Sequence, residues 1–466
     1  MSEEIIKKAE NIIRTSEKLG ASEAEILTYS FDDSSTRFTR SLIDQSTESK
    51  EQGAYIKIVN KNRCYAEAFI KSTEEETIAK VISDLLEHAK SGANVPFTPS
   101  SKIPPMMDTF IKRTAELTTE ERAETAKLVI QTAHSISEKI TKVAGAIATR
   151  VAHLALVNTS GLSLAHSYTG CSIICTPLAE DCGSLGVGFA SQSSRDFSEI
   201  DVRSVAEESA REAVLSLNPK PIDLGRYYTI FQPDAAGDIV GSFIQLGFST
   251  QRDPHYIQSD SICASDLLTV TDEPHNLKTL MPIPFDFEGT PTTSLTFIEK
   301  GIAKEKCYDK GLALQENRSS TGHAPFPHDP TYSSKFFPGW VYYPTNQIVQ
   351  GAQATKWDII KDVKRAILVK RLMYAGLPMG MSTGLQGRDI MQAHTMGTWL
   401  IEDGQIKNAL PCLRLSDSLN QMVKKIEVIG DISSVKKLGC INTPWLAIND
   451  VLFTEISSLA VPEGMW

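Results

Sequence analysis

Residues 227–250 read YYTIFQPDAAGDIVGSFIQLGFST, and this stretch joins a strand pattern directly to a helix pattern. Its first five residues, Tyr227 to Phe231, are mostly aromatic or β-branched, which predicts a buried strand. Pro233 suits the first turn of a helix, and Asp234 could accept a backbone N–H at the helix N-terminus. Apolar side chains then fall on nearly every face of the predicted helix, so we expect it to be buried. A buried strand followed by a buried helix is a suitable platform for a functional site.

This predicted helix carries few side chains that could perform catalysis. From Ile239 to Phe248 there is no His, Cys, Asp or Glu. Ser242 follows Gly241, but a serine in mid-helix usually donates its hydroxyl hydrogen to a carbonyl of its own helix. We therefore do not expect Ser242 to act as a nucleophile.

The length of the chain predicts two domains, because 466 residues exceed what one hydrophobic core usually supports. The most suitable boundary is Asn218-Pro219-Lys220-Pro221, where two prolines break periodic structure and stiffen the connection. The expected N-terminal domain spans residues 1–218, and the expected C-terminal domain spans residues 223–466.

Charge and composition limit the classes of partner. The formal net charge of −10 argues against a nucleic-acid surface, which needs a basic stripe. No apolar run approaches the roughly 18 residues of a membrane span, and the opening MSEEIIKKAE is amphipathic rather than signal-like. The eight cysteines are scattered without CxxC spacing and are expected to be reduced thiols. We expect a cytoplasmic protein that binds neither nucleic acid nor membranes.

Periodicity along the chain predicts an α+β fold. Helical patterns cover residues 3–19, 72–90, 118–139 and 201–217, with a weaker pattern near 355–374. Strand pairs joined by turn residues are expected at 54–70, 151–166, 294–308 and 399–406. A polar turn is expected at Asp32-Asp33-Ser34. Many hairpins with a few helices, and no regular βαβ alternation, are typical of α+β proteins.

Several other residues are candidates for metal or substrate binding. His323 and His328 lie in STGHAPFPHDP (320–330), where a loop could bring them together with Asp329 around one metal ion. A solvated turn is the plainer interpretation, because an unsupported loop rarely fixes tetrahedral geometry. His394 precedes Thr395-Met396-Gly397 and could line a pocket, although a core or surface histidine is the more usual role.

Two acidic residues and one thiol complete the candidates. Asp286 and Glu288 are two apart and would share a face in an extended strand, where paired carboxylates can share a proton or hold a cation. The alternative is a charged turn that leads into the next hairpin. Cys440 is an isolated thiol, and a ligand role would need partners that the sequence does not reveal.

Six segments in order resemble the TldD/PmbA family, also called modulators of DNA gyrase. These segments are SSTRFTRSLIDQ (34–45), GAYIKIVNKNRCYAEA (53–68), LVNTSGL (156–162), PFDFEGTPT (284–292), SSTGHA (319–324) and GTWLIEDGQI (397–406). The resemblance extends over almost the whole chain. It implies an N-terminal α+β domain and a C-terminal domain built from a strongly curved, barrel-like antiparallel sheet.

The resemblance also implies which branch of the family this chain belongs to. TldD-like members carry HExxxH on the helix that follows the strand corresponding to residues 227–231, and a later cysteine completes a zinc site. The two histidines would fall at Gly241 and Leu246, the glutamate at Ser242 and the cysteine at Cys440. Because the first three are missing, the chain is similar to the PmbA/TldE branch, which pairs with a TldD-like protease subunit. We expect no cofactor in this chain, zinc in the partner, and assembly as a heteromer or a homodimer that acts on peptides.

Two other functions remain open from the sequence. One is a self-sufficient metal-dependent peptidase whose site draws on His323, His328, Asp329 or Cys440. The other is a peptide- or protein-binding module with no protease partner. His323 also stands where the family usually has asparagine.

Overall fold

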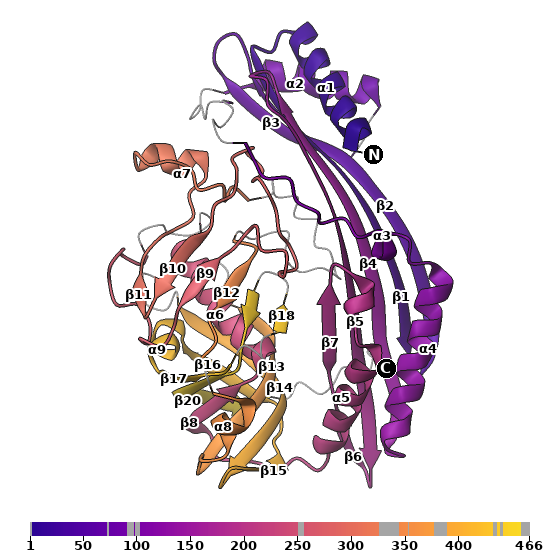
Figure 1. Cartoon of the computed structure of the whole chain (residues 1–466), viewed down its shortest axis with the longest axis vertical. Coiled ribbons are helices and arrows are strands. Elements are labelled where there is room, and N and C mark those ends of the chain that lie inside the picture. The colour runs from indigo at the N-terminus through magenta and orange to yellow at the C-terminus, as the bar shows by residue number, and fades with distance from the viewer. Residues whose placement is uncertain are drawn as a thin grey trace.

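The computed structural model describes residues 2–71, 74–90, 97, 103–249, 256–325, 344–352, 354–376, 389–431, 436–438 and 441–457. One long curved sheet forms the N-terminal part of the molecule, and two smaller sheets lie beside it in the C-terminal part (Figure 1). This arrangement confirms the α+β class, including the strongly curved C-terminal sheet. None of the helices in these ranges is long and apolar enough to cross a membrane.

The N-terminal sheet has the order β3-β2-β1-β4-β5-β6, and β7 also pairs with β5. Its strands are antiparallel: β1 (Glu23–Thr39), β2 (Leu42–Val59), β3 (Tyr65–Ile70), β4 (Ile140–Asn158), β5 (Ser163–Asp181), β6 (Ser184–Val187) and β7 (Ala190–Ser194). The helices of this part are α1 (Ser2–Leu19), α2 (Glu75–His88), α3 (Lys112–Ala115), α4 (Thr119–Ile136), η1 (Phe197–Glu199) and α5 (Val202–Leu215). The predicted 54–70 and 151–166 hairpins are confirmed as β2–β3 and β4–β5.

The prediction of a turn at Asp32-Asp33-Ser34 is wrong. Strand β1 runs straight through these residues, because β2 and β4 pair with them on both sides. Arg150 on β4 donates two 2.6 Å hydrogen bonds to the Asp33 carboxylate, which compensates the charge within the sheet. The chain turns instead at Arg40 and Ser41, both of which have positive φ.

The C-terminal part contains a closed barrel and a second, six-stranded sheet. The barrel sheet has the order β13-β8-β20-β16-β14-β15, and pairing of β13 with β14 closes it. The second sheet has the order β11-β10-β9-β12-β19-β18. The barrel strands are β8 (Gly225–Phe231), β13 (Arg365–Gly376), β14 (Ile390–Glu402), β15 (Gln405–Ala409), β16 (Leu413–Ser418) and β20 (Leu446–Ile456), with β17 (Ile426–Ile429) on β20. The second sheet comprises β9 (Val270–Asp272), β10 (Leu295–Glu299), β11 (Ile302–Ala303), β12 (Gln347–Val349), β18 (Lys436–Leu438) and β19 (Ile441–Thr443).

Helix α6 (Pro233–Phe248) lies between the barrel and the second sheet. Its buried residues share one core cluster with Val270 and Phe297 of the second sheet and with Ile367 of the barrel. This confirms that the helix after the opening strand is buried. The N-cap residue is Gln232 rather than Asp234, and no side chain caps the helix. Asp234 lies in the first turn, where its charge favours the positive end of the helix dipole.

The predicted helix near 355–374 is mostly wrong. A short helix, α8 (Lys356–Ile360), is followed by strand β13. The apolar run in β13 fits between β8, with which it is parallel, and β14, with which it is antiparallel. The remaining short helices of this part are α7 (Lys310–Gln315) and α9 (Leu419–Lys424).

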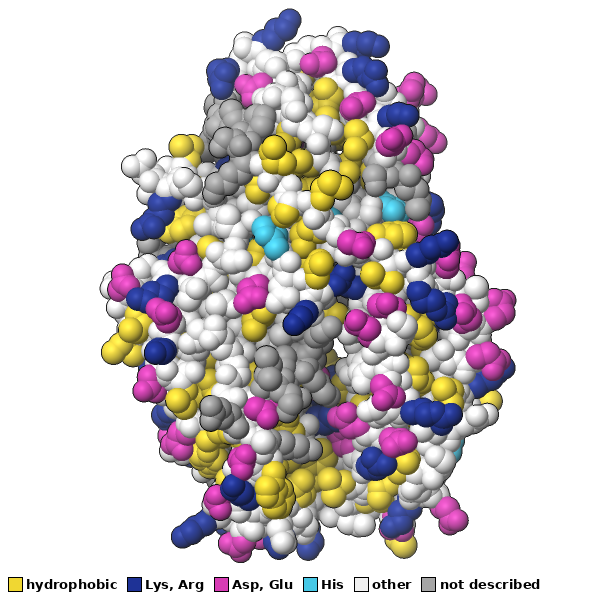
Figure 2. All heavy atoms as spheres, viewed as in Figure 1, with side chains coloured by type: hydrophobic (Ala, Val, Ile, Leu, Met, Phe, Trp, Pro, Cys, Tyr) yellow, Lys and Arg dark blue, Asp and Glu magenta, His cyan; other side chains and the backbone are white. Residues whose placement is uncertain are grey.

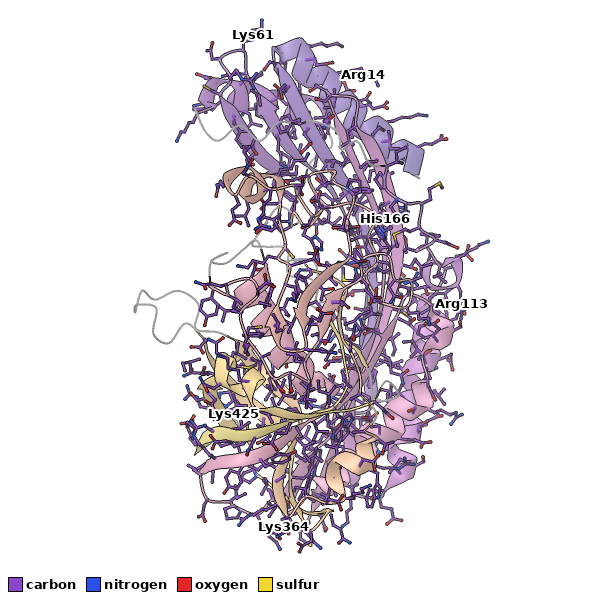
Figure 3. All side chains as sticks on the ribbon, turned by 60° about the vertical axis from the view of Figure 1, so that its left-hand side comes forward. Arg14, Lys61, Arg113, His166, Lys364 and Lys425 are labelled. Carbon is purple, nitrogen blue, oxygen red and sulfur yellow. The ribbon has the colours of Figure 1, made fainter. Side chains whose placement is uncertain are left out.

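The two parts of the molecule are joined by a hydrophobic cluster. Ile283, Phe285 and Phe287 leave the C-terminal part and pack on buried residues of β1, β4 and β5. His166 of β5, about halfway along the long sheet in Figure 3, meets Phe285 edge to face with ring centroids 6.4 Å apart. Burial lowers the pKa of His166 to about 4, so the ring is neutral at neutral pH. The loop at 281–291 therefore fixes the C-terminal part against the sheet.

The surface shown in Figure 2 carries Lys and Arg side chains interspersed with Asp and Glu. No continuous basic stripe crosses this face of the described residues, in keeping with the acidic net charge of −10.

Candidate functional site

The first candidate site is the middle of α6 together with strand β19. Gly241 and Ser242 are partly exposed, whereas Leu246 is only 5% exposed. Among the described residues, a Cβ atom added at Gly241 would meet no atom closer than 4.0 Å, and the atom at that distance is Cδ1 of Ile441. The structure thus leaves room for a side chain at position 241 and places β19 opposite it.

Cys440 lies outside the described residues. Of the three positions on α6, Gly241 offers no side chain, Ser242 offers one hydroxyl, and Leu246 offers an aliphatic group. These three residues do not fit a zinc site, which needs imidazole, thiolate or carboxylate donors. Among the described residues, no group of three or more His, Cys, Asp or Glu side chains is arranged to hold a metal ion.

The space at Gly241 leads to a testable expectation for stability. Gly241→Ala should raise the free energy of unfolding by about 0.5–1 kcal/mol, because glycine destabilises a helix interior and the new methyl group meets no clash. Urea unfolding followed by circular dichroism measures this. Gly247→Ala on the same helix is the matched control: its Cβ would overlap Ile257, so that variant should be destabilised. A destabilised Gly241→Ala variant would show that position 241 is not open.

The second candidate site contains His323, which is fully buried, as is its neighbour Asp272. Nε2 of His323 is 3.2 Å from Oδ2 of Asp272, and Nδ1 is 3.0 Å from the carbonyl oxygen of Thr321. Both ring nitrogens face oxygen atoms, so the pair joins strand β9 to the 319–325 loop through a buried polar contact. Asn346 donates its backbone N–H to the other Asp272 oxygen at 2.8 Å.

This environment replaces the solvated turn as the interpretation of His323. The sequence did not identify Asp272 as its partner, because 51 residues separate the two. His328 and Asp329 lie outside the described residues, so their proposed grouping with His323 stays a prediction. Within the described part of the chain, the imidazole of His323 is engaged by Asp272 and Thr321 and serves the packing of the second sheet.

Asp286 and Glu288 have different surroundings and do not form a carboxylate pair. The Asp286 carboxylate is fully buried and accepts backbone N–H groups from Ala324, Glu288 and Thr290 at 2.8–3.0 Å. Burial raises its pKa to about 6, although those three hydrogen bonds oppose the shift. Glu288 accepts the backbone N–H of Lys310 at 2.7 Å. The pKa of Glu288 is raised to about 7, mainly by burial and to a smaller extent by the negative charge of Asp286. Asp286 therefore organises the loop that joins the two parts of the molecule.

His394 lies on β14 in the barrel. Its ring meets Tyr374 edge to face, with centroids 6.5 Å apart. Its Nδ1 atom is buried and has no hydrogen-bond partner among the described residues. Among the described residues, these contacts fit a packed barrel residue.

Comparison with known proteins places these features in a family. Residues 224–455 match the PmbA/TldA metallopeptidase C-terminal domain, and residues 112–217 match the central domain of the same proteins. The two matches together cover more than half of the chain. The chain belongs to the PmbA/TldD family.

Curated relatives in the PmbA/TldD family are distant. The chain is 24% identical to the Metalloprotease PmbA of Escherichia coli O157:H7 over 344 residues, which cover 72% of this chain and 70% of that protein. It is 26% identical to the Metalloprotease PmbA homolog of Buchnera aphidicola over 282 residues, which cover 59% of this chain and 57% of that protein. These two alignments thus span 57% and 70% of the relatives' own length.

Solved structures of PmbA/TldD-like proteins share the fold over nearly the whole chain. TldE from Thermococcus kodakarensis superposes with a TM-score of 0.79 at 18% identity, covering 96% of this chain and all of that one. A protein from Thermotoga maritima described as a modulator of DNA gyrase gives a TM-score of 0.79 at 19% identity, covering 96% and 99%. At these identities the similarity concerns the fold alone.

Proposed function

We propose that this chain is the catalytically degenerate subunit of a heteromeric metallopeptidase. In this proposal a TldD-like partner supplies the zinc site, and the present chain completes the space in which small or unfolded peptides are processed. The observation that carries the proposal is the composition of α6, where Gly241, Ser242 and Leu246 stand at the positions at which the family resemblance would place HExxxH.

Two further observations support it. Membership in the PmbA/TldD family gives a metallopeptidase-like architecture, and the fold is similar to a protein named TldE. The buried environments of His323 and Asp286 leave those two residues committed to contacts inside the chain. An intact metal site in a second chain would then supply what α6 does not.

The test compares the purified chain alone with a mixture of this chain and a TldD-like chain. Alone, the protein should contain well under one zinc per chain and should leave unstructured peptides uncleaved. Adding the partner should produce cleavage, and a partner whose HExxxH glutamate is replaced by glutamine should not. Elemental analysis and mass spectrometry of the peptide products measure these outcomes.

Other outcomes would favour the other functions. Stoichiometric zinc and cleavage by the lone chain would support a self-sufficient peptidase and contradict the proposal. Peptide binding without any complex with a TldD-like chain would indicate a binding module instead.

A further inference from the structure

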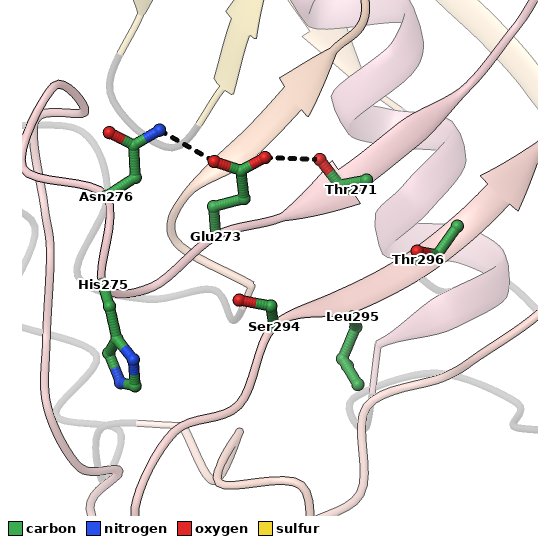
Figure 4. Close-up of a pocket in the computed structure, with 7 residues that line it drawn as sticks. All are labelled: Thr271, Glu273, His275, Asn276, Ser294, Leu295 and Thr296. Carbon is green, nitrogen blue, oxygen red and sulfur yellow. Dashed lines mark hydrogen bonds between the residues drawn. The ribbon is translucent and has the colours of Figure 1, made fainter.

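A polar pocket of about 350 Å³ opens on the second sheet, beside strands β9 and β10 (Figure 4). Its lining residues are Thr271, Glu273, His275, Asn276, Ser294, Leu295 and Thr296. Thr271 and Thr296 are paired across β9 and β10, whereas their neighbours Val270 and Phe297 belong to the core cluster that contains α6. Successive side chains of a strand point to opposite faces, so this pocket lies on the face away from α6. It is therefore separate from the candidate site at Gly241, Ser242 and Leu246 of α6.

The central group of the pocket is the Glu273 carboxylate. Asn276 donates its amide N–H to one carboxylate oxygen at 2.8 Å, and the Thr271 hydroxyl lies 3.4 Å from the other (Figure 4). The backbone on both sides is held as well, because Glu273 N–H donates to Asn346 and Asn276 N–H donates to the Glu273 carbonyl. No basic side chain among the described residues forms an ion pair with Glu273. The carboxylate is thus held in position, and the side chains that hold it among the described residues are neutral.

His275 adds an acceptor rather than a donor. The Thr292 hydroxyl donates its only hydrogen to the carbonyl of Ile283 at 2.6 Å, so its oxygen accepts from Nε2–H of His275 at 2.9 Å. Burial lowers the pKa of His275, against the opposing charge of Asp272, so the ring is neutral at neutral pH. Nδ1 then carries a lone pair.

The remaining polar groups also favour a ligand that donates hydrogen bonds. The side-chain carbonyl oxygen of Asn276 already accepts the backbone N–H of Lys278, and one of its two amide hydrogens is donated to Glu273. None of the seven lining residues is Lys or Arg, and the His275 ring is neutral, so a phosphate or carboxylate would meet only the negative charge of Glu273. An ammonium group would find the Glu273 carboxylate and the hydroxyl oxygens of the threonines and the serine that line the pocket.

We propose that this pocket is a binding site for a primary ammonium group, supplied by a peptide amino terminus or by a lysine side chain. The site uses residues of this chain alone and needs neither a metal ion nor a partner subunit. It is therefore distinct from the proposed role of α6, and the failure of one leaves the other intact.

The experiment titrates the full-length chain with three probes by saturation-transfer difference NMR. The probes are trialanine amide, its N-acetylated form, and N-acetyl-lysine amide. Trialanine amide, N-acetyl-lysine amide or both should bind with a millimolar Kd, which is typical of one charged contact. The acetylated tripeptide should bind at least about tenfold more weakly than the best binder. Binding by only one of the two amines identifies the source of the ammonium group.

Two variants and one control test the residues. Glu273→Gln should weaken amine binding at least about tenfold, because it removes the charge and keeps the shape of the side chain. Ser294→Arg should abolish binding by filling the pocket with a cation. Glu299→Gln, an exposed carboxylate at the end of β10, should leave binding unchanged. Circular dichroism melting confirms that each variant is folded. Equal binding of the acetylated peptide, no binding of either amine, or unchanged binding in the folded Glu273→Gln variant would overturn the proposal.

Discussion

Asp286→Ala is expected to lower the free energy of unfolding by about 3–4 kcal/mol. The carboxylate is fully buried and accepts three backbone N–H groups, from Ala324, Glu288 and Thr290. Removing it leaves three donors without an acceptor, and each buried unsatisfied donor costs about 1–3 kcal/mol when water cannot reach it. The flanking Phe285 and Phe287 pack on the long sheet, so the loss should loosen the contact between the two parts of the molecule.

Urea unfolding monitored by tryptophan fluorescence measures the change, and hydrogen exchange along β4 reports on the contact. Asp286→Asn is the graded control. Its amide oxygen can still accept from Glu288 and Thr290, while its NH₂ group would face the N–H of Ala324. The decrease in the free energy of unfolding for Asp286→Asn should therefore lie between zero and the decrease for Asp286→Ala. A change below about 1 kcal/mol in Asp286→Ala would show that the loop does not depend on this carboxylate.

The parts of the fold that the sequence predicts are those whose cause is local. The 399–406 hairpin turns at Asp403 and Gly404, and both have the positive φ that such two-residue turns require. Thr118 and Glu121 form a reciprocal capping box at the start of α4, where the sequence predicts a helix. In both places neighbours within four residues determine the conformation, so the pattern alone is sufficient.

The wrong secondary-structure predictions occur where contacts with distant segments determine the conformation. Residues 365–376 have an apolar run that suits either a helix or a strand, and the choice follows from pairing with β8 and β14. The turn expected at Asp32-Asp33-Ser34 is absent, because Arg150 supplies the charge that stabilises Asp33 within the sheet. No local pattern carries that information.

Some features of the candidate sites could likewise be predicted from the sequence, and others could not. The absence of His, Cys, Asp and Glu between Ile239 and Phe248 is visible in the sequence, as is the burial of the helix. The partners of His323 and of Asp286 are not visible, since Asp272 lies 51 residues and Ala324 lies 38 residues away along the chain. The pocket around Glu273 could not be predicted from the sequence for a similar reason. It combines the end of β9 with the start of β10, two segments about 20 residues apart.

A second large effect is expected from Lys370→Met, which should lower the free energy of unfolding by about 3–5 kcal/mol at pH 8. Lys370 of β13 is 2% exposed, and its Nζ lies 2.5 Å from Glu212 and 2.8 Å from Glu208, both on α5. Burial lowers the pKa of Lys370, but the charges of Glu212 and Glu208 outweigh it, so the net shift is upward. The cluster therefore joins the N-terminal part to the barrel, and removing the ammonium group leaves a buried carboxylate without its cation.

The loss caused by Lys370→Met should shrink as the pH falls. Burial raises the pKa of Glu212 to about 7 even though Lys370 opposes the shift, so without the lysine this pKa lies higher still. In the unfolded chain a glutamate has a pKa of about 4.3, so between these values the native state binds a proton that the unfolded state has lost. Lowering the pH from 8 to 5.5 thus stabilises the native variant, because Glu212 becomes neutral.

Urea unfolding at pH 8 and pH 5.5 tests this for wild type, Lys370→Met, and the double variant Lys370→Met/Glu212→Gln. The double variant should recover most of the loss at pH 8, since no uncompensated carboxylate remains at position 212, and it should show little further gain at pH 5.5. An equal loss for Lys370→Met at both pH values would contradict the assignment of the effect to Glu212. A double variant as unstable as the single one would attribute the loss to the packing of the lysine stem instead.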